Sequence, residues 1–514
     1  MKSVNKPSVH IIGAGISGLS AGIYLQKSGF DTTIFEKHDI PGGLCTSWDI
    51  GDYTFDGCLQ WLLGSRPGSS FYKMWREIID IDNLSFINHD CRIRLEVRNS
   101  VNKYGNKSFY FYNNLDKLQD YLLDLAPEDE SLIKEWISDV RYFQRFDLPP
   151  VLTDEGFIKN TITRIKMVRY LGLFLKYLKF KNQTNKTFAL KFKNTFLREV
   201  FDQLYDQFEV NMLVIMFPMA SYDLESAGYP LGGSLKLARH FEEMYIAAGG
   251  IIHYKTPVLK INTEKDKVRS ITVRNQVKHM ADYVISAGDW KYTMCDLLDG
   301  KYDKPAQQYL LHDRIYKPYY SSLQCSFGLD IDMKDYDHFT RFPLETSIFS
   351  PDGMEYDRFE IHIFNYDPTM APKGKTCVIV NFYTENSEFW ITLRAKERVK
   401  YREEKMIFLE RVKKILSEKI EGFYAHLEVE DMSTPATYLR YTNNWLGSTQ
   451  GWLPGKNMIK SFPIKLKVPG LKNMFVASHW NQPGGGLPIA VTVARQVTQD
   501  ICKIEKRKFL GGTN

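Results

Sequence analysis

The 514-residue chain is 44% hydrophobic and 25% charged, which is typical of a globular protein with more than one core and excludes a disordered chain. Its net charge of +6 is too small to indicate nucleic acid binding by itself. The seven cysteines are scattered without a C-x-x-C pair, so we expect free thiols and no metal site. Since no secretory signal or long apolar run is visible, we expect a cytoplasmic protein without a membrane span.

The first forty residues carry the pattern of a dinucleotide-binding unit, with a strand predicted at 8–12, a helix at 16–28 and a second strand at 32–35. Between the first strand and the helix, Gly13 suits a tight turn, Gly15 lets the backbone approach a pyrophosphate, and Gly18 lets helix and strand pack closely. Glu36 follows the second strand, where a carboxylate accepts hydrogen bonds from an adenosine ribose. This order of parts favours a dinucleotide site over a glycine turn in an unrelated α/β fold.

A second glycine pair, Gly42-Gly43 followed by Leu44, comes six residues after the acid. NAD enzymes have no need of such a pair at this place. The arrangement resembles the flavoprotein family that includes amine oxidases, protoporphyrinogen oxidase and phytoene desaturase. In that family the double glycine brings the backbone close to the pyrophosphate and ribityl region of the cofactor. The alternative interpretation is a surface turn after the strand.

The segment 158–198 contains many basic residues and no acidic one. On a helix, one side would collect Met167, Leu171, Phe174, Leu175 and Leu178, and the opposite side would collect Lys166, Arg169 and Lys176. Such a basic amphipathic helix is typical of a segment that lies on an anionic membrane. The alternative is a helix that buries its apolar side in the domain and leaves its lysines in solvent.

Alternating runs at 321–327 and 377–382 predict strands of a second, antiparallel or mixed sheet. Near the C-terminus, a strand is predicted at 473–477 and a helix at 489–503, with three consecutive glycines between them. Without Cβ atoms, Gly484 to Gly486 would let a flat ring lie against the backbone. Pro488 suits the first turn of the helix, whose dipole would stabilise negative charge on a reduced flavin.

The run from Pro483 to Pro488, Pro-Gly-Gly-Gly-Leu-Pro, resembles the C-terminal flavin segment of the phytoene desaturase, carotenoid isomerase and retinol saturase group. A central block, 229–288, resembles the same group: Val258 stands where that family places backbone against the adenine, and 281–288 resembles its strand returning to the cofactor. The resemblance covers both ends and this block, and it implies one non-covalently bound FAD.

Two departures from the family pattern limit what is carried over. Ser478-His479 stands where relatives often have Gly-Asp, so His479 either donates to a phosphate or caps the strand. Gln60 stands in the region where the saturase and isomerase branch commonly has a histidine, and no catalytic residue is therefore assigned.

We expect an α/β fold, with a split FAD-binding Rossmann-like domain at 1–80, 225–300 and 465–514, and an inserted mixed α+β substrate domain at 81–224 and 301–464. The expected cofactor-binding residues are Gly13, Gly15, Ile16, Ser17, Gly18, Glu36, Lys37, Gly42, Gly43, Leu44, Val258, Ala287, Gly288, His479, Gly484, Gly485, Gly486, Leu487 and Pro488.

The resemblance implies an FAD-dependent desaturase or saturase that passes hydride between the flavin and a carbon of a polyene or isoprenoid lipid. One alternative is a redox-neutral isomerase of the carotenoid type that uses reduced FAD. Another is a non-enzymatic prenyl-lipid-binding protein of the same fold. The complete set of glycines argues against it, because such proteins lack a complete flavin site. The expected partners are a hydrophobic small molecule and the surface of an anionic membrane, without nucleic acid.

Overall fold

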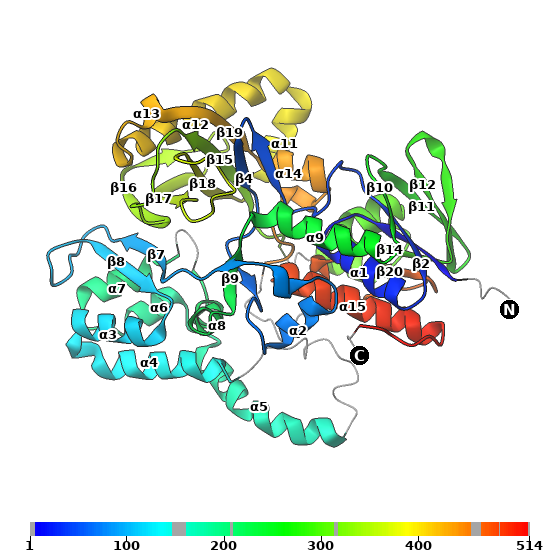
Figure 1. Cartoon of the computed structure of the whole chain (residues 1–514), viewed down its shortest axis with the longest axis horizontal. Helices are drawn as coiled ribbons and strands as arrows, with labels where there is room; N and C mark the ends of the chain where they lie inside the picture. The colour runs from blue at the N-terminus through cyan, green and yellow to red at the C-terminus, as the bar shows by residue number, and fades with distance from the viewer. Residues whose placement is uncertain are drawn as a thin grey trace.

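The computed structural model describes residues 6–145, 161–205, 209–312, 317–453, 464–482 and 484–511, with the side chains of residues 161–170, 309 and 312 outside this description. Two larger sheets organise these ranges, and helices pack around both of them (Figure 1). One sheet is parallel and the other is mixed, so the expected α/β fold with a Rossmann-like sheet is confirmed.

The parallel sheet has five strands in the order β10-β2-β1-β14-β20. These are β1 (Ser8–Ile12), β2 (Asp31–Phe35), β10 (Ile251–His253), β14 (Tyr283–Ser286) and β20 (Met474–Val476). Every neighbouring pair is parallel, although the strands come from three separated stretches of the chain. Their apolar side chains therefore fill cores on both faces of the sheet.

Helices cover one face of this sheet and a small sheet covers the other (Figure 1). The helices are α1 (Ile16–Lys27), α9 (Gly233–Ala247) and α15 (Leu487–Ile504). The small antiparallel sheet consists of β11 (Val258–Glu264), β12 (Lys267–Val273) and β13 (Lys278–Met280). Alternate strand residues separate the two cores: Ile11 and Ile285 face the helices, whereas Ile12 and Val284 face the small sheet.

The second sheet has seven strands in the order β19-β15-β18-β17-β16-β7-β8. These are β7 (Cys91–Glu96), β8 (Ser108–Tyr112), β15 (Ser321–Leu329), β16 (Phe339–Phe349), β17 (Glu355–Ile363), β18 (Thr376–Thr384) and β19 (Leu427–Ser433). Only the β7–β16 pair is parallel among them. The strands predicted at 321–327 and 377–382 lie in β15 and β18, which are antiparallel neighbours.

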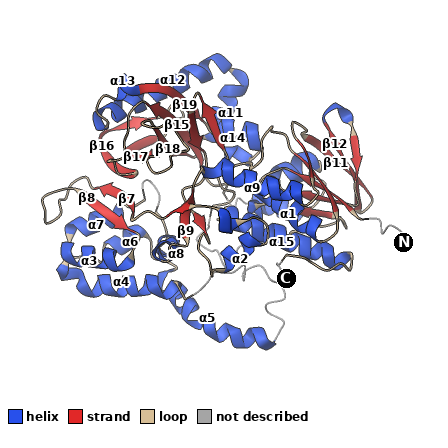
Figure 2. Cartoon of the chain, in the orientation of Figure 1, coloured by secondary structure: helices blue, strands red, loops and turns tan. Residues whose placement is uncertain are grey.

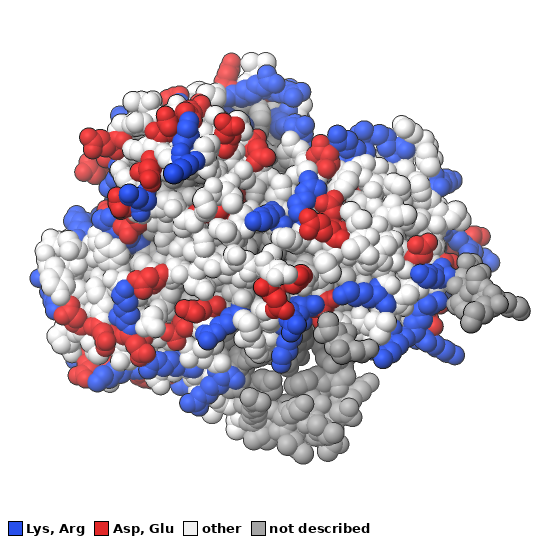
Figure 3. All heavy atoms as spheres, in the orientation of Figure 1, with Lys and Arg blue, Asp and Glu red and all other residues white. Residues whose placement is uncertain are grey.

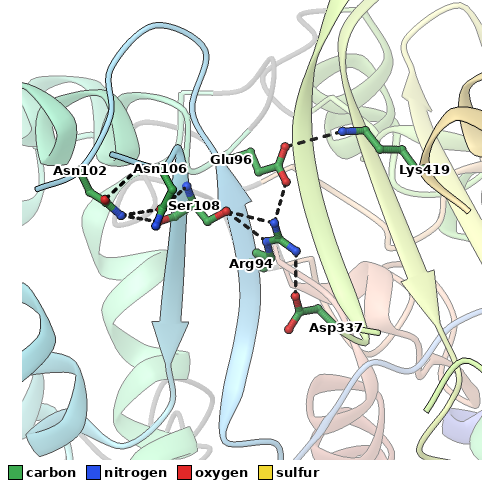
Figure 4. A network of polar contacts seen from close by, with 7 residues as sticks. All are labelled: Arg94, Glu96, Asn102, Asn106, Ser108, Asp337 and Lys419. Carbon is green, nitrogen blue, oxygen red and sulfur yellow. Dashed lines mark hydrogen bonds and ion pairs between the residues drawn. The ribbon is translucent and has the colours of Figure 1, made fainter. Parts of the chain in front are cut away.

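An ionic network at Arg94 of β7 ties the two sequence halves of this sheet together (Figure 4). The guanidinium of Arg94 pairs with Glu96 at 3.1 Å and with Asp337 at 3.2 Å. Glu96 in turn lies 3.8 Å from the ammonium of Lys419, the last residue of α12 (Arg398–Lys419). Because these ion pairs are partly exposed, each contributes little free energy. The parallel pairing of β7 with β16 is the main link between the two halves of the sheet.

The remaining helices and strands flank and connect the two sheets (Figure 2). Short strands are β3 (Ser47–Ile50), β4 (Tyr53–Asp56), β5 (Leu62–Leu63), β6 (Phe86–Ile87) and β9 (Ala227–Pro230). Helices beside the second sheet are α11 (Ser387–Lys396), α13 (Phe423–His426) and α14 (Pro435–Thr442). Other helices are α2 (Ser70–Arg76), α3 (Leu115–Leu125), α4 (Glu130–Phe143), α5 (Thr161–Phe180), α6 (Asn185–Ala189), α7 (Thr195–Asp202), α8 (Met212–Asp223) and α10 (Lys304–Gln307).

Helix α5 places its apolar and basic sides differently from the sequence expectation. Its described apolar side chains Leu171, Phe174, Leu175 and Leu178 are 41% to 57% exposed. The lysines of the same stretch, Lys176 and Lys179, instead form ion pairs with Asp139 of α4. Lys176, which was expected among the solvated basic residues of this helix, is therefore held by a carboxylate from another helix. The side chains of Lys166, Met167 and Arg169 lie outside the described residues.

Within the part of the chain that the structure describes, no helix combines the length and apolar character needed to cross a membrane.

The contact between α1 and the first glycine turn generates a stability prediction. A Cβ atom at Gly18 would overlap the carbonyl oxygen of Gly13 and press on the side chain of Ala287 at 3.1 Å. Gly18→Ala should therefore lower the free energy of unfolding by about 1–3 kcal/mol, the cost typical of overpacking. Chemical denaturation of the cofactor-free protein measures it. As a control, Gly288→Ala should leave the midpoint unchanged, because no atom lies within 4 Å of its added Cβ; equal midpoints for both variants would contradict the packing argument.

Candidate cofactor site

A cavity of about 810 Å³ lies at the carboxyl edge of the parallel sheet. This edge is where open α/β sheets bind ligands, and the volume lies in the upper part of the range of about 300–1,000 Å³ for small-molecule sites. Of the nineteen expected cofactor residues, the cavity is lined by all but Gly18. Gly18 instead packs against Gly13 behind the lining. Residues more than 400 positions apart in the sequence therefore share one cavity wall.

The N-terminus of α1 points its free backbone N–H groups at this cavity. Gly15 is the N-cap residue and makes no side-chain capping hydrogen bond, so the first turn leaves donors unsatisfied. The hydroxyl of Ser17 does not face a ligand, because it donates to the carbonyl oxygens of Ala477 at 2.5 Å and Ala490 at 3.1 Å. What Ile16 and Ser17 offer an anion is therefore their backbone N–H groups and the helix dipole.

The double glycine lies directly beside this helix terminus. Gly42 forms a parallel bridge with Gly15, and its N–H donates to the carbonyl oxygen of Ala14 at 2.8 Å. Gly42 has a φ of +105°, and a Cβ there would overlap the carbonyl oxygen of Cys45. The pair is thus part of the cavity wall and not a separate surface turn.

Glu36 is buried at the end of β2, and both of its carboxylate oxygens are occupied by backbone donors. The N–H of Ala14 donates to Oε2 at 2.6 Å, and the N–H of His38 donates to Oε1 at 2.8 Å. Burial raises the pKa of Glu36 above its ordinary value, although these two hydrogen bonds act in the opposite direction. The carboxylate therefore fixes the glycine turn and still has lone pairs for a ribose. Its neighbour Lys37 hydrogen-bonds Asn443 next to α14.

The three C-terminal glycines all have positive φ, +90°, +50° and +88°, which side-chain-bearing residues rarely adopt. Gln450 holds this corner by donating from its amide nitrogen to the carbonyl oxygen of Gly484 at 2.5 Å. The backbone of Gly485 lines the cavity, but a Cβ there would overlap the carbonyl oxygen of Gln450, so a side chain at this position would point at protein. The expectation that a flat ring lies against the Cβ position of Gly485 is therefore wrong. At Gly484 this position is open, because no atom lies within 4 Å of an added Cβ.

His479, which stands where relatives often have an acid, is uncharged. Burial lowers the pKa of His479 to about 4, so at neutral pH it brings no positive charge to a phosphate. The strand end is capped by its neighbours instead: the N–H of Ser478 donates to Oδ1 of Asn481 at 2.8 Å.

Two carboxylates near the cavity were missed by sequence reasoning. Asp56 caps α9, accepting from the N–H of Ser234 at 2.6 Å, and burial raises its pKa. Asp289 accepts from the N–H groups of Tyr292 at 2.7 Å and Trp445 at 3.0 Å, and burial raises its pKa to about 6. In the sequence, the position of Asp289 directly after Gly288, at the end of a strand, could have indicated that this carboxylate lies near the cavity.

The second sheet supplies the other end of the cavity, which the sequence did not indicate. Polar residues of β15, β17 and β18 line it: Ser322, Gln324, His362, Asn381 and Tyr383. Burial lowers the pKa of His362 to about 4, so its imidazole is neutral. The alternation in these strands was visible in the sequence, but it does not say which face meets the cavity.

Comparisons with known proteins agree with this architecture. A family model described as an NAD(P)-binding Rossmann-like domain matches residues 11–78. The chain is 22% identical to a 4,4'-diaponeurosporene oxygenase of Staphylococcus haemolyticus, over 98% of both chains. It is 22% identical to a 4,4'-diapophytoene desaturase of a Methylomonas species, over 98% of this chain and 97% of the relative. An oxidoreductase structure from Methanosarcina mazei has a TM-score of 0.58 at 15% identity, covering 96% of this chain and 100% of that one.

Two glycines allow the cofactor site to be tested without strain on the backbone. Gly15 has an ordinary φ of −69°, with only Gly42 O near an added Cβ, at 3.8 Å, and Gly288 has no atom near its Cβ. Gly15→Val and Gly288→Val should fold normally and lower FAD affinity at least about tenfold, because each side chain would fill ligand space. Fluorescence titration of cofactor-free protein with FAD measures this, with thermal unfolding of the same samples as the control. Unchanged FAD affinity in both variants would contradict the assignment.

Proposed function

We propose that the chain is a carotenoid desaturase-like FAD oxidoreductase that acts on carbon–carbon bonds of a polyene isoprenoid. Its similarity to carotenoid desaturases and oxygenases, which extends along nearly its whole length, supports this proposal. The observation that carries this proposal is the single cavity, which joins the glycine-rich edge of the parallel sheet to the floor formed by the second sheet. FAD, when bound, supplies the hydride acceptor or donor.

The residues of the chain fit FAD at the edge of the parallel sheet. The uncapped N-terminus of α1 and the neighbouring Gly42-Gly43 turn offer backbone donors and space to a pyrophosphate, and Glu36 offers an acceptor to a ribose. Val258 lies beside the adenine position that the family resemblance implies, and the Gly484–Gly486 corner precedes the N-terminus of α15. Both ends of a dinucleotide therefore have a place in the same cavity.

The remaining wall is suited to an apolar chain. The apolar residues Leu59, Trp61, Leu62 and Phe71 also line the cavity. Such a wall orients a long hydrocarbon by contact and excludes water from the reacting carbons. Because His362 and His479 are both neutral, neither side chain supplies a proton at neutral pH. We infer that positioning of the substrate is the main contribution of the chain.

Anaerobic mixing of the FAD-loaded protein with acyclic carotenoids tests the proposed function. A desaturase should bleach the visible band of oxidised FAD, whereas a saturase should restore that band from photoreduced enzyme; either result supports the proposal. Putrescine serves as a control, because an amine should leave both spectra unchanged. Isomerisation of the polyene without any flavin change, or reduction of FAD by the amine alone, would contradict it.

We also propose that the chain contacts a bilayer through the apolar side of α5. Leu171, Phe174 and Leu175 are each at least half exposed. Exposure of three apolar side chains to water on one helix face is unfavourable and marks a site of interaction. Lys181 and Lys186, just after the helix, are exposed, and exposed lysines attract anionic headgroups. Insertion of the apolar side, with the flanking lysines at the surface, supports access to a lipid-soluble substrate.

Vesicle co-sedimentation tests this contact. The variant Leu171→Gln/Phe174→Gln/Leu175→Gln should lose most binding to vesicles of phosphatidylcholine and phosphatidylglycerol, because the area that inserts becomes polar. The matched control changes three exposed apolar residues of α12, Val399, Met406 and Ile407, to Gln and should bind normally. Retention of binding by the α5 variant, or equal loss in both, would exclude α5 as the contact.

A further inference from the structure

A second cavity of about 440 Å³ lies next to the cofactor cavity, on the side of α11, α12 and α14. The two cavities share part of their wall, including Glu36, Gly43, Leu44 and Tyr441. The smaller cavity therefore meets the adenosine side of the expected cofactor position and lies away from the Gly484–Gly486 corner, whose residues do not line it.

Five cationic side chains line the smaller cavity: Arg394, Arg398, Arg402, Lys405 and Arg440. Three of them share one face of α12, because spacings of four and three residues place side chains on the same side of a helix. Within the described residues, none of the five forms a salt bridge with a carboxylate. Lys413, further along the same helix, pairs with Glu410 at 2.5 Å and Glu430 at 2.8 Å, so cations elsewhere on α12 do find partners.

The acidic residues of this cavity do not balance its positive charge. Among the described residues of the lining, only Glu36 and Asp431 carry carboxylates, against five cationic side chains. His38 also lines the cavity; its pKa is lowered mainly by burial, and the charges of Lys37 and Arg440 act in the same direction. The cavity therefore keeps a net positive potential at neutral pH.

The start of α12 adds to this potential. Arg398 is the first residue of a 22-residue helix, and its N-cap residue Glu397 makes no side-chain capping hydrogen bond. Free N–H groups of the first turn and the helix dipole favour an anion at this end. Figure 3 shows Lys and Arg side chains gathered at the top of the molecule, over the region where Figure 1 places α12.

Aromatic rings complete the lining and narrow the class of ligand. Trp48, Tyr401, Tyr438 and Tyr441 all contribute, and the ring of Tyr441 contacts the imidazole of His38 at a centroid distance of 4.6 Å. Guanidinium groups match phosphate oxygens in pairs, and aromatic rings offer faces on which a base stacks. We propose that this cavity binds a nucleoside diphosphate group of a second ligand, separate from FAD, with its phosphates on the α12 arginines.

Isothermal titration of FAD-saturated protein with ADP tests the proposal. ADP should bind, and the double variant Arg398→Ala/Arg402→Ala should weaken its binding about tenfold or more, because charge-assisted hydrogen bonds to phosphate are lost. The matched control Lys396→Ala/Lys400→Ala removes two exposed cations outside the cavity lining and should keep the wild-type affinity. Alanine preserves the helix in both variants, which thermal unfolding verifies.

Two further measurements separate this site from the cofactor cavity. FAD titrated into cofactor-free protein should bind the Arg398→Ala/Arg402→Ala variant as tightly as wild type; a parallel loss of FAD and ADP affinity would show that the cations serve FAD, and would overturn the proposal. Release of FAD by added ADP, absence of ADP binding, or adenosine binding as tightly as ADP would also overturn it. None of these outcomes depends on whether a polyene is the substrate.

Discussion

The parallel pairing of β14 with β1 on one side and β20 on the other is the constraint on which the site depends. It aligns Ile12, Ser286 and Val476 in one row, so the three strands end at the same edge. Beyond that row, the N–H of Ala287 donates to the carbonyl oxygen of Ile12 at 2.9 Å, and the N–H of Ala477 donates to Ser286 at 2.8 Å. A slip of one residue would turn each strand's side chains to the opposite face and move the glycine segments apart.

Glycines near this edge fill two distinct physical roles. At Gly18, Gly42 and Gly485 a Cβ would collide with a backbone carbonyl oxygen, so absence of a side chain permits the local fold. At Gly15 and Gly288 the added atom would meet almost nothing, so absence of a side chain leaves room for a ligand. The same residue type therefore supports packing at some positions and binding at others.

Local patterns in the sequence predicted the parts of the structure that local chemistry decides. The strand at Ser8–Ile12, the helix beginning at Ile16 and the strand preceding Glu36 follow from periodicity and glycine spacing, and the structure has all three. The orientation of α5 could not be predicted in this way, because Asp139, a carboxylate on α4, determines where Lys176 points. Likewise, the wall behind Gly485 comes from Gln450, a residue of a distant loop that no local pattern connects to the glycines.

The central claim is that one dinucleotide spans the cavity from the N-terminus of α1 to the Gly484–Gly486 corner. A crystal structure of the FAD-loaded protein measures this most directly. We expect pyrophosphate density between Gly15 and the Gly42-Gly43 turn, ribose density at Glu36, and the flavin ring between Gly484 and the floor of the second sheet. Dinucleotide density in the arginine-lined cavity, or a ring lying away from that floor, would contradict the account.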